Sequence, residues 1–290
     1  MSSALTKKTY VFKRASDIDI KLDVHVPSNT SKKLPIFYWI HGGGNVQGRR
    51  QAVPPHMKAA ASRLGFAIVS PDYRLAPQAR LPAILEDLAD SFRFTIEQLP
   101  GRLEKEEKIL LDAENLIVSG SSVGGFDALH VALGMCPTLS LSQSSDLLRR
   151  VKAIPIIYPI TTFDAPFFKD AQEPFMGYLS EKDMEDPAFK TFIDPSAPVV
   201  ANTDSTESDV SPLRNKLYMY AQQTAPKSGF QQLVFGEELI AQGWLEKSDC
   251  VKFVAKEAEA IKKTVNGGKG VEIYIVHGDA DKAVAYSQAT

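Results

Sequence analysis

The residues best suited to chemistry in this 290-residue sequence lie in "GSSVGG" (120–125), which fits G-x-S-x-G with Ser122 at its centre. The segment follows the apolar run "LIVS" and precedes the helix-like "FDALHVAL". A serine on a sharp strand-to-helix turn has a strained backbone, and Gly120 and Gly124 leave the space that such a turn needs. The bare pattern also occurs in ordinary glycine-rich turns, but this context indicates a nucleophilic serine.

A second glycine-rich segment, "HGGG" (41–44), follows the apolar run "PIFYWI". Three successive glycines can turn their backbone N–H groups into a cavity, which is what the oxyanion of an acyl transfer requires. The alternatives are a flexible turn or a phosphate-binding loop. However, the spacing G-x-G-x-x-G is absent and no Walker lysine follows. About 80 residues before a G-x-S-x-G segment, "HGGG" predicts an oxyanion hole.

The elements that must position these segments are predicted from hydrophobic periodicity. Alternation in "IDIKLDVHV" predicts an antiparallel hairpin with "TYVFK", covered on one side, with His25 on the solvent side. Continuous apolar runs are typical of parallel strands buried on both faces. Apolar residues spaced by three and four predict helices over 81–99 and 249–268. The runs that predict buried strands are 35–40, 66–70, 116–120, 153–158 and 271–276.

More than a hundred residues separate Tyr158 from Val271 without a strong buried-strand pattern. A structureless loop of that length is improbable in a compact domain. We therefore expect a helical insertion over the carboxyl end of the sheet, where α/β folds bind ligands. Its large apolar residues either line a pocket or form the core of the insertion: Phe167, Phe168, Phe175, Met176, Tyr218 and Trp244.

"HGGG", "DYRLAP" and G-x-S-x-G-G follow successive predicted strands in this order. In this respect the chain resembles the hormone-sensitive-lipase-like branch of the α/β-hydrolase superfamily, which contains carboxylesterases and lipases. The resemblance is dense from Pro35 to about Tyr158 and resumes at Val271. It implies an α/β-hydrolase fold, with a mostly parallel sheet flanked by helices. The core would comprise residues 1–160 and 268–290, and a helical cap with the helix leading back to the core would comprise 161–267.

Carried over residue by residue, the resemblance makes Ser122 the nucleophile. The oxyanion hole would be formed by the backbone amides of Gly42, Gly43 and Val123. The positions that would support this geometry are His41, Gly44, Gly120 and Gly124.

The "PDYRLAP" segment is expected to be structural, with Asp72, Tyr73 and Arg74 tying this loop to its neighbours through hydrogen bonds. Three positions depart from the family pattern. Ser121 stands where the family commonly has Asp or Thr, Val123 stands where it commonly has Ala, and Gln78 replaces the usual Glu. The two changes beside the serine could tune the turn without abolishing it.

The final segment, "HGDADKAVAYSQAT", fits the acid loop of the family. The resemblance implies Asp281 as the triad acid, with Asp279 as a weaker alternative. A metal cluster formed by His277, Asp279 and Asp281 is a different interpretation. Their alternate spacing suits neither ligation from one helix face nor the dense coordination of a calcium loop.

A triad also needs an imidazole between the serine and the acid. In this fold the histidine follows the acid, but nine residues follow Asp281 and none is histidine. The favoured hypothesis is a shortened version of a longer enzyme. The others are a relative that binds a small molecule without catalysis, and substitution by another histidine. None of the five histidines is a strong candidate for that substitution: His25, His41, His56, His130 and His277.

The composition limits the classes of partner. The chain is 44% hydrophobic and 23% charged with a net charge of −2, and it has no basic stripe typical of a nucleic-acid-binding surface. Two cysteines, no leader pattern and no long apolar run predict a cytoplasmic protein that does not contact a membrane. We therefore expect a carboxylesterase-type serine hydrolase of small acyl esters or lactones, without metal or organic cofactor. An exposed sheet edge could support a homodimer.

Overall fold

A seven-stranded sheet organises the chain, with the strand order β1-β2-β4-β3-β5-β8-β9. This computed structural model describes residues 5–28, 32–174, 176–203, 212–278, 281, 284 and 286–288. The first two strands form an antiparallel hairpin, and the strands from β4 to β9 in that order run parallel. The strands are β1 (Leu5–Ala15), β2 (Ile18–Pro27), β3 (Leu34–Ile40), β4 (Ala67–Pro71), β5 (Leu111–Ser121), β8 (Val151–Ile157) and β9 (Glu272–Val276).

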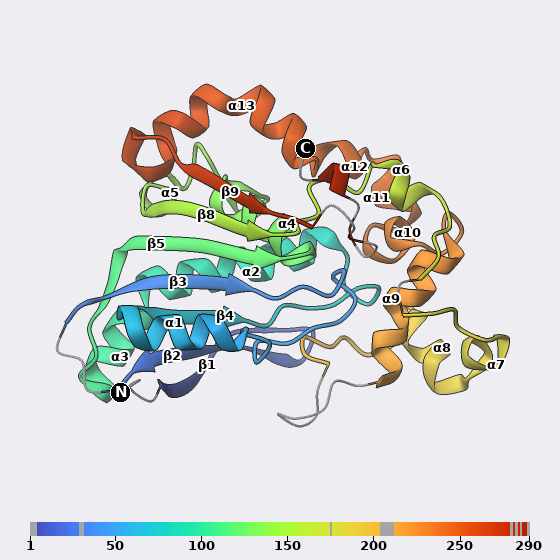
Figure 1. Ribbon diagram of the computed structural model, residues 1–290, viewed down its shortest axis with the longest axis horizontal. Helices are drawn as coiled ribbons and strands as arrows, with labels where there is room; N and C mark the ends of the chain where they lie inside the picture. The colour runs from blue at the N-terminus through green and yellow to red at the C-terminus, as the bar shows by residue number, and fades with distance from the viewer. Residues whose placement is uncertain are drawn as a thin grey trace.

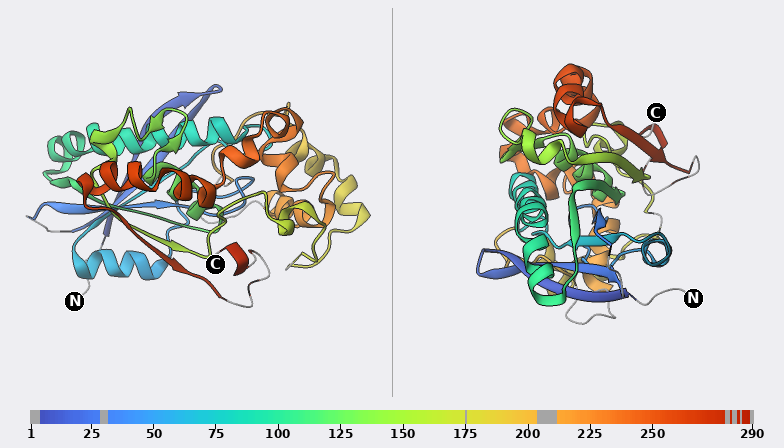
Figure 2. Two further views of the ribbon diagram at one scale, coloured as in Figure 1. Left: turned by 90° about the horizontal axis from the view of Figure 1, so that it is seen from above. Right: turned by 90° about the vertical axis from the view of Figure 1, so that its left-hand side faces the viewer.

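Helices lie on both faces of the sheet, as an α/β fold requires. Figure 2 shows α1 on one face and the α2–α3 pair on the other. A short hairpin of β6 (Met135–Cys136) and β7 (Leu139–Ser140) follows α4. The helices alongside the sheet are α1 (Pro55–Leu64), α2 (Leu81–Glu97), α3 (Leu99–Glu107), α4 (Val123–Ala132), α5 (Ser145–Leu148) and α13 (Cys250–Thr264), with the 3₁₀ turns η1 (Val265–Gly268) and η2 (Tyr286–Gln288).

Short helices between β8 and α13 gather beyond the carboxyl ends of β3 and β5, on the right of Figure 1. Helical structure was predicted for this stretch, and the structure confirms it. The division into a core and a cap stays a prediction. The helices are α6 (Pro166–Lys169), α7 (Glu181–Glu185), α8 (Pro187–Ile193), α9 (Pro212–Thr224), α10 (Phe230–Val234), α11 (Gly236–Ala241) and α12 (Trp244–Lys247).

Helix α2 shows why the periodicity prediction succeeds. Leu81, Ile84, Leu85 and Leu88 recur at spacings of three and four, and all four are fully buried. Asp90, on the outward face, forms an ion pair with Lys13. The helix therefore buries one apolar stripe against the sheet. Of its acidic residues, Asp90 is partly exposed, whereas Asp87 is buried in ion pairs with Lys13 and Arg74.

Two burial predictions were wrong. The run 271–276 was expected to be buried on both faces, but all five residues of β9 are exposed and Val276 is 66% exposed. The reason is position, because β9 is the edge strand of the sheet. His25 was expected on the solvent side, but it is 6% exposed. Helix α1 packs on β2, and the charge of its Lys58 acts on His25, so this face is covered.

No helix within the described ranges is both long enough and apolar enough to cross a membrane.

Candidate active site

The register of the sheet brings the three predicted catalytic segments to one edge. Ile40 pairs with Gly120, so the glycine loop after β3 lies beside the end of β5. Ser121 pairs with Ile157, and Ile157 pairs with Val276 at the end of β9. Because these strands are parallel, the segments that follow them leave the sheet at the same end.

Ser122 occupies a strained turn between β5 and α4. Its φ of 56° and ψ of −128° lie in a region that residues other than glycine rarely adopt. The turn is held by hydrogen bonds, since the Ser122 amide donates to Ile157 O (3.0 Å) and Ser122 O accepts from Ile160 N (3.1 Å). The strand–turn–helix geometry predicted from G-x-S-x-G is therefore present.

The glycines around Ser122 are required by close backbone contacts. A Cβ on Gly120 would overlap the carbonyl oxygen of Gly124, and a Cβ on Gly124 would overlap that of Ile40. The first contact closes the turn on itself. The second packs the start of α4 against the end of β3, which sets the distance between the serine and the glycine loop.

The glycine loop lies directly against the serine. A Cβ on Gly42 would lie 2.8 Å from Ser121 O and 3.2 Å from Ser122 Cβ. Gly43 and Gly44 have φ values of 119° and 66°, which favour glycine. The glycines therefore let the backbone of the loop lie close to Ser122, which side chains at these positions would prevent.

His41 is built into the shape of this loop. Its Nδ1 donates to Gly42 O (2.9 Å), and its ring stacks on Tyr73 with centroids 4.4 Å apart. The Tyr73 hydroxyl donates to His41 O (3.0 Å). Burial lowers the pKa of His41 to about 4, so the ring is neutral at neutral pH. These contacts are those of a structural residue.

The other residues of "PDYRLAP" are also structural, as predicted. Arg50 bridges Asp72 (Nη1–Oδ2 2.6 Å) and Asp23 (Nε–Oδ1 2.8 Å). Arg74 pairs with Asp87 of α2 (Nε–Oδ2 2.7 Å). Burial, opposed by Arg50, raises the pKa of Asp72 to about 6. The ion pairs tie the loop after β4 to the neighbouring strand and helix.

The acid loop after β9 holds Asp281 in a local network. Asp281 Oδ1 accepts from Val284 N (3.0 Å), and Oδ2 lies 3.5 Å from His277 Nε2. The same His277 nitrogen is 3.0 Å from Val284 O. The sequence predicted His277 at a strand end, four residues before the acid and in the wrong topological place for the triad base. The structure brings the two side chains together. Asp279 lies outside the described residues.

The remaining histidines lie away from the serine. His130 lies about two turns along α4 from the serine, with Nδ1 2.9 Å from Phe126 O and 3.7 Å from Cys250 Sγ. Burial lowers its pKa to about 4. His56 is exposed on α1, and His25 lies on β2. Among the residues that the structure describes, no contact joins a histidine ring to Ser122.

The side chain that does contact Ser122 comes from the helical insertion. Tyr218 of α9 hydrogen-bonds the Ser122 side chain, and the charge of Asp281 acts on the same phenol. Tyr218 is 5% exposed, and its ring packs on Phe230 with centroids 4.8 Å apart. The sequence placed Tyr218 among cap residues that line a pocket or form a core, but it carried no signal for this contact.

Arg214 and Phe230 are among the residues that hold the insertion over the glycine loop. The buried guanidinium of Arg214 donates from Nε to Val46 O (2.7 Å) and from Nη2 to Ala76 O (3.0 Å). The ring of Phe230 leaves no room for a side chain on Gly44. Helices α9 and α10 are therefore locked to the loop that flanks the serine.

The other insertion residues named from sequence have mixed positions. Phe168 is 2% exposed within an aromatic cluster with Phe163 and Phe230, so it belongs to the core. Met176 is 51% exposed. Phe175 lies outside the described residues.

The family model for the alpha/beta hydrolase fold matches residues 37–228, which include the glycine loop, the serine turn and Tyr218. The chain belongs to the α/β-hydrolase family. The match and the fold confirm the resemblance to the hormone-sensitive-lipase-like branch that the motifs indicated.

Solved structures agree on the fold of this α/β hydrolase. An alpha/beta hydrolase superfamily protein from Enterococcus faecalis superposes with a TM-score of 0.57 at 17% identity, covering 96% of this chain and 94% of that one. A protein of unknown function from Staphylococcus aureus gives 0.57 at 14% identity, covering 98% and 83%.

Curated relatives are much longer proteins. The non-reducing polyketide synthase ausA of Penicillium brasilianum is 30% identical over 188 residues, which is 63% of this chain. The non-reducing polyketide synthase ascC of Acremonium egyptiacum is 35% identical over 134 residues, or 46% of this chain. The matched segments span 7% and 6% of those synthases.

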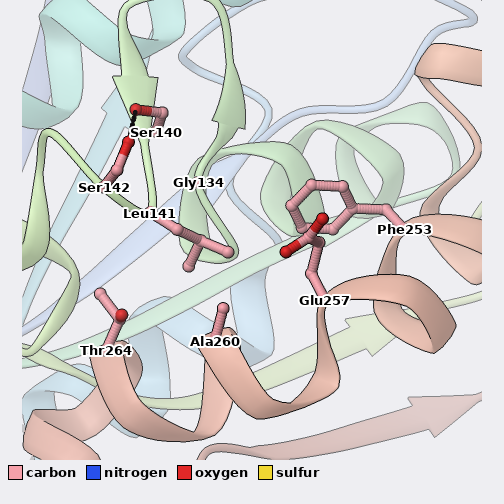
Figure 3. A pocket seen from close by; sticks show the side chains of 8 residues that line it. All are labelled: Gly134, Ser140, Leu141, Ser142, Phe253, Glu257, Ala260 and Thr264. Atoms are coloured by element: carbon pink, nitrogen blue, oxygen red, sulfur yellow. Dashed lines mark hydrogen bonds between the residues drawn. The ribbon is translucent and has the colours of Figure 1, made fainter.

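A concavity of the hydrolase lies at the end of α4 far from Ser122. It has a volume of about 350 Å³ between the β6–β7 hairpin and α13, and Ser140, Phe253 and Glu257 are among its lining residues (Figure 3). Ser122 precedes the first residue of α4, and Gly134 at this concavity follows the last turn. The ten residues of α4 alone give a separation of about 15 Å along the helix. The concavity is therefore distinct from the serine site.

In the part of the chain that the structure describes, no group of three or more His, Cys, Asp or Glu side chains could hold a metal ion.

Proposed function

We propose that this α/β hydrolase is a carboxylesterase-type serine hydrolase whose nucleophile is Ser122. The observation that carries the proposal is the strained φ of Ser122 on the β5–α4 turn, directly beside Gly42. Strain of this kind persists only where the surrounding packing holds the backbone in place. A strained turn at this point places the serine side chain at the carboxyl end of the sheet. An ordinary glycine-rich turn would have no need of it.

The proposed reaction is acyl transfer. Ser122 Oγ attacks the carbonyl carbon of an ester or lactone while its proton passes to a general base, and the carbonyl oxygen gains negative charge. When the tetrahedral intermediate collapses, the ester C–O bond breaks and the alkoxide leaves with that proton as the alcohol. The backbone amides of Gly42, Gly43 and Val123 would stabilise that charge. We assign Asp281 as the acid; its Oδ2 lies 3.5 Å from the imidazole of His277.

Small acyl esters and lactones are the proposed substrates. The relatives named polyketide synthases add a polyketide acyl group as a candidate. We also propose that residues 161–267 act as a cap that shapes the acyl site, while 1–160 and 268–290 form the core. Arg214 supports this division, because it locks α9 over the glycine loop.

The test is covalent labelling with a fluorophosphonate probe. We expect one adduct, mapped by mass spectrometry to Ser122, and none in Ser122→Ala. Ser142→Ala, beside the concavity between the β6–β7 hairpin and α13, is a matched control that should label like the wild type. Absence of a Ser122 adduct in the folded wild type would overturn the proposal.

The second candidate function is ligand binding without catalysis. The observation that favours it is the hydrogen bond of Ser122 to the phenol of Tyr218, since no contact among the described residues joins an imidazole to this serine. In that case an acyl ester would bind saturably, as followed by calorimetry, with no hydrolysis and no Ser122 adduct. Labelling of Ser122 would exclude this candidate.

A further inference from the structure

Tyr218 brings the helical insertion into direct contact with the proposed nucleophile. Its phenol hydrogen-bonds Ser122, and its ring is buried against Phe230, which in turn fills the space over Gly44. The three residues come from α9, the β5–α4 turn and α10. The contact is therefore between the insertion and the catalytic edge of the core.

The helix that carries Tyr218 is anchored, so the phenol has a fixed position. Four residues earlier on α9, Arg214 donates to Val46 O (2.7 Å) and Ala76 O (3.0 Å). Residues four apart lie on the same face of a helix, so the anchor and the phenol face the core together. The hydrogen bond to Ser122 is thus part of a rigid site.

The charge of Asp281 gives the phenol a preferred orientation. A carboxylate attracts the positive end of the O–H dipole, and it leaves the phenol oxygen as an acceptor on its other side. Ser122 then donates its proton to that oxygen and keeps its lone pairs free for a carbonyl carbon. Burial and the charge of Asp281 raise the pKa of Tyr218, so the phenol stays protonated at neutral pH.

We propose that Tyr218 is a positioning residue of the Ser122 site, which orients the serine hydroxyl toward the side of Asp281 and so sets the rate of Ser122 acylation. This inference rests on the proposed function of Ser122. It assigns the insertion a direct role in the chemistry, beyond covering an acyl pocket.

The test compares second-order rates of fluorophosphonate labelling of Ser122 in the full chain. Tyr218→Phe keeps the ring against Phe230 and removes the hydroxyl. We expect labelling to slow roughly tenfold, the equivalent of one hydrogen bond. Tyr220→Phe is the matched control, since Tyr220 is on the same helix and packs edge-on against Phe189 (5.6 Å). Its rate should equal that of the wild type.

A double-mutant cycle with Asp281→Asn separates orientation from packing. If the carboxylate acts through the phenol, the double variant Tyr218→Phe/Asp281→Asn should label no more slowly than the slower single variant. Thermal unfolding of each variant establishes that it is folded.

The outcomes distinguish the two proposals. A labelled wild type with an equally fast Tyr218→Phe, or with fully additive losses in the cycle, would overturn the role of Tyr218 and leave Ser122 as the nucleophile. An unlabelled wild type would overturn the proposed function and the role of Tyr218 with it.

Discussion

The Cβ that Gly42 lacks would lie 3.2 Å from the Cβ of Ser122 and 2.8 Å from Ser121 O. The glycine loop after β3 and the serine turn after β5 are therefore in steric contact at this point. The backbone amides of the loop and the hydroxyl of Ser122 derive their relative positions from it.

This contact predicts the effect of Gly42→Ala. The added methyl must push the loop away from Ser121, which moves the proposed oxyanion donors. We expect fluorophosphonate labelling of Ser122 to slow roughly 100-fold, the effect of losing one such donor. In Gly101→Ala, where nothing lies within 4 Å of the new Cβ, the rate should be unchanged. Equal rates in Gly42→Ala and the wild type would contradict this relationship.

The strain at Ser122 predicts a gain in stability when it is relieved. Glycine tolerates a positive φ, so Ser122→Gly should raise the free energy of unfolding by about 1 kcal/mol while labelling is lost. Ser122→Ala keeps the Cβ and should show no gain. Urea unfolding of the three proteins measures the difference. A Ser122→Gly variant no more stable than Ser122→Ala would argue against stored strain.

Arg214 should contribute more to stability than an exposed cation on the same helix. Burial lowers its pKa to about 10, and its guanidinium bonds two carbonyl oxygens. Arg214→Met leaves those oxygens without this donor, and we expect a loss of about 3 kcal/mol in the free energy of unfolding. Lys216→Met breaks a partly exposed ion pair with Asp183 and should cost less than about 1 kcal/mol. Similar losses in urea unfolding would refute the anchoring role.

His130 predicts a pH dependence of stability. Burial lowers its pKa from 6.5 to about 4 in the folded state, so the unfolded chain takes up the proton first as the pH falls. Neutral His130 contributes about 3 kcal/mol to the free energy of unfolding. This contribution is complete above pH 6.5 and is lost as the pH falls toward 4. His130→Gln should flatten this dependence relative to the wild type. Parallel curves of unfolding free energy against pH would contradict it.

Local patterns predicted the elements and the turn correctly because their causes are local. The spacing of Leu81, Ile84 and Leu88 defines a helix face, and the space that Gly120 leaves is filled by Gly124 four residues later. Strand order then follows from parallel pairing. These features bring "HGGG" to Ser122 without further information.

Burial and contacts between residues far apart in the sequence could not be predicted from local patterns. The apolar run of β9 resembles that of β3, but its place at the sheet edge leaves it exposed, which depends on the whole topology. The contact between Tyr218 and Ser122 depends on how α9 is anchored by Arg214. No local pattern encodes that anchoring.

The most direct measurement of the central claim is acyl transfer from a nitrophenyl ester to the chain. We expect release of nitrophenol with formation of an acyl-Ser122 peptide, detected by mass spectrometry, and neither in Ser122→Ala. An acyl group elsewhere, or equal nitrophenol release by Ser122→Ala, would contradict the claim that Ser122 is the nucleophile.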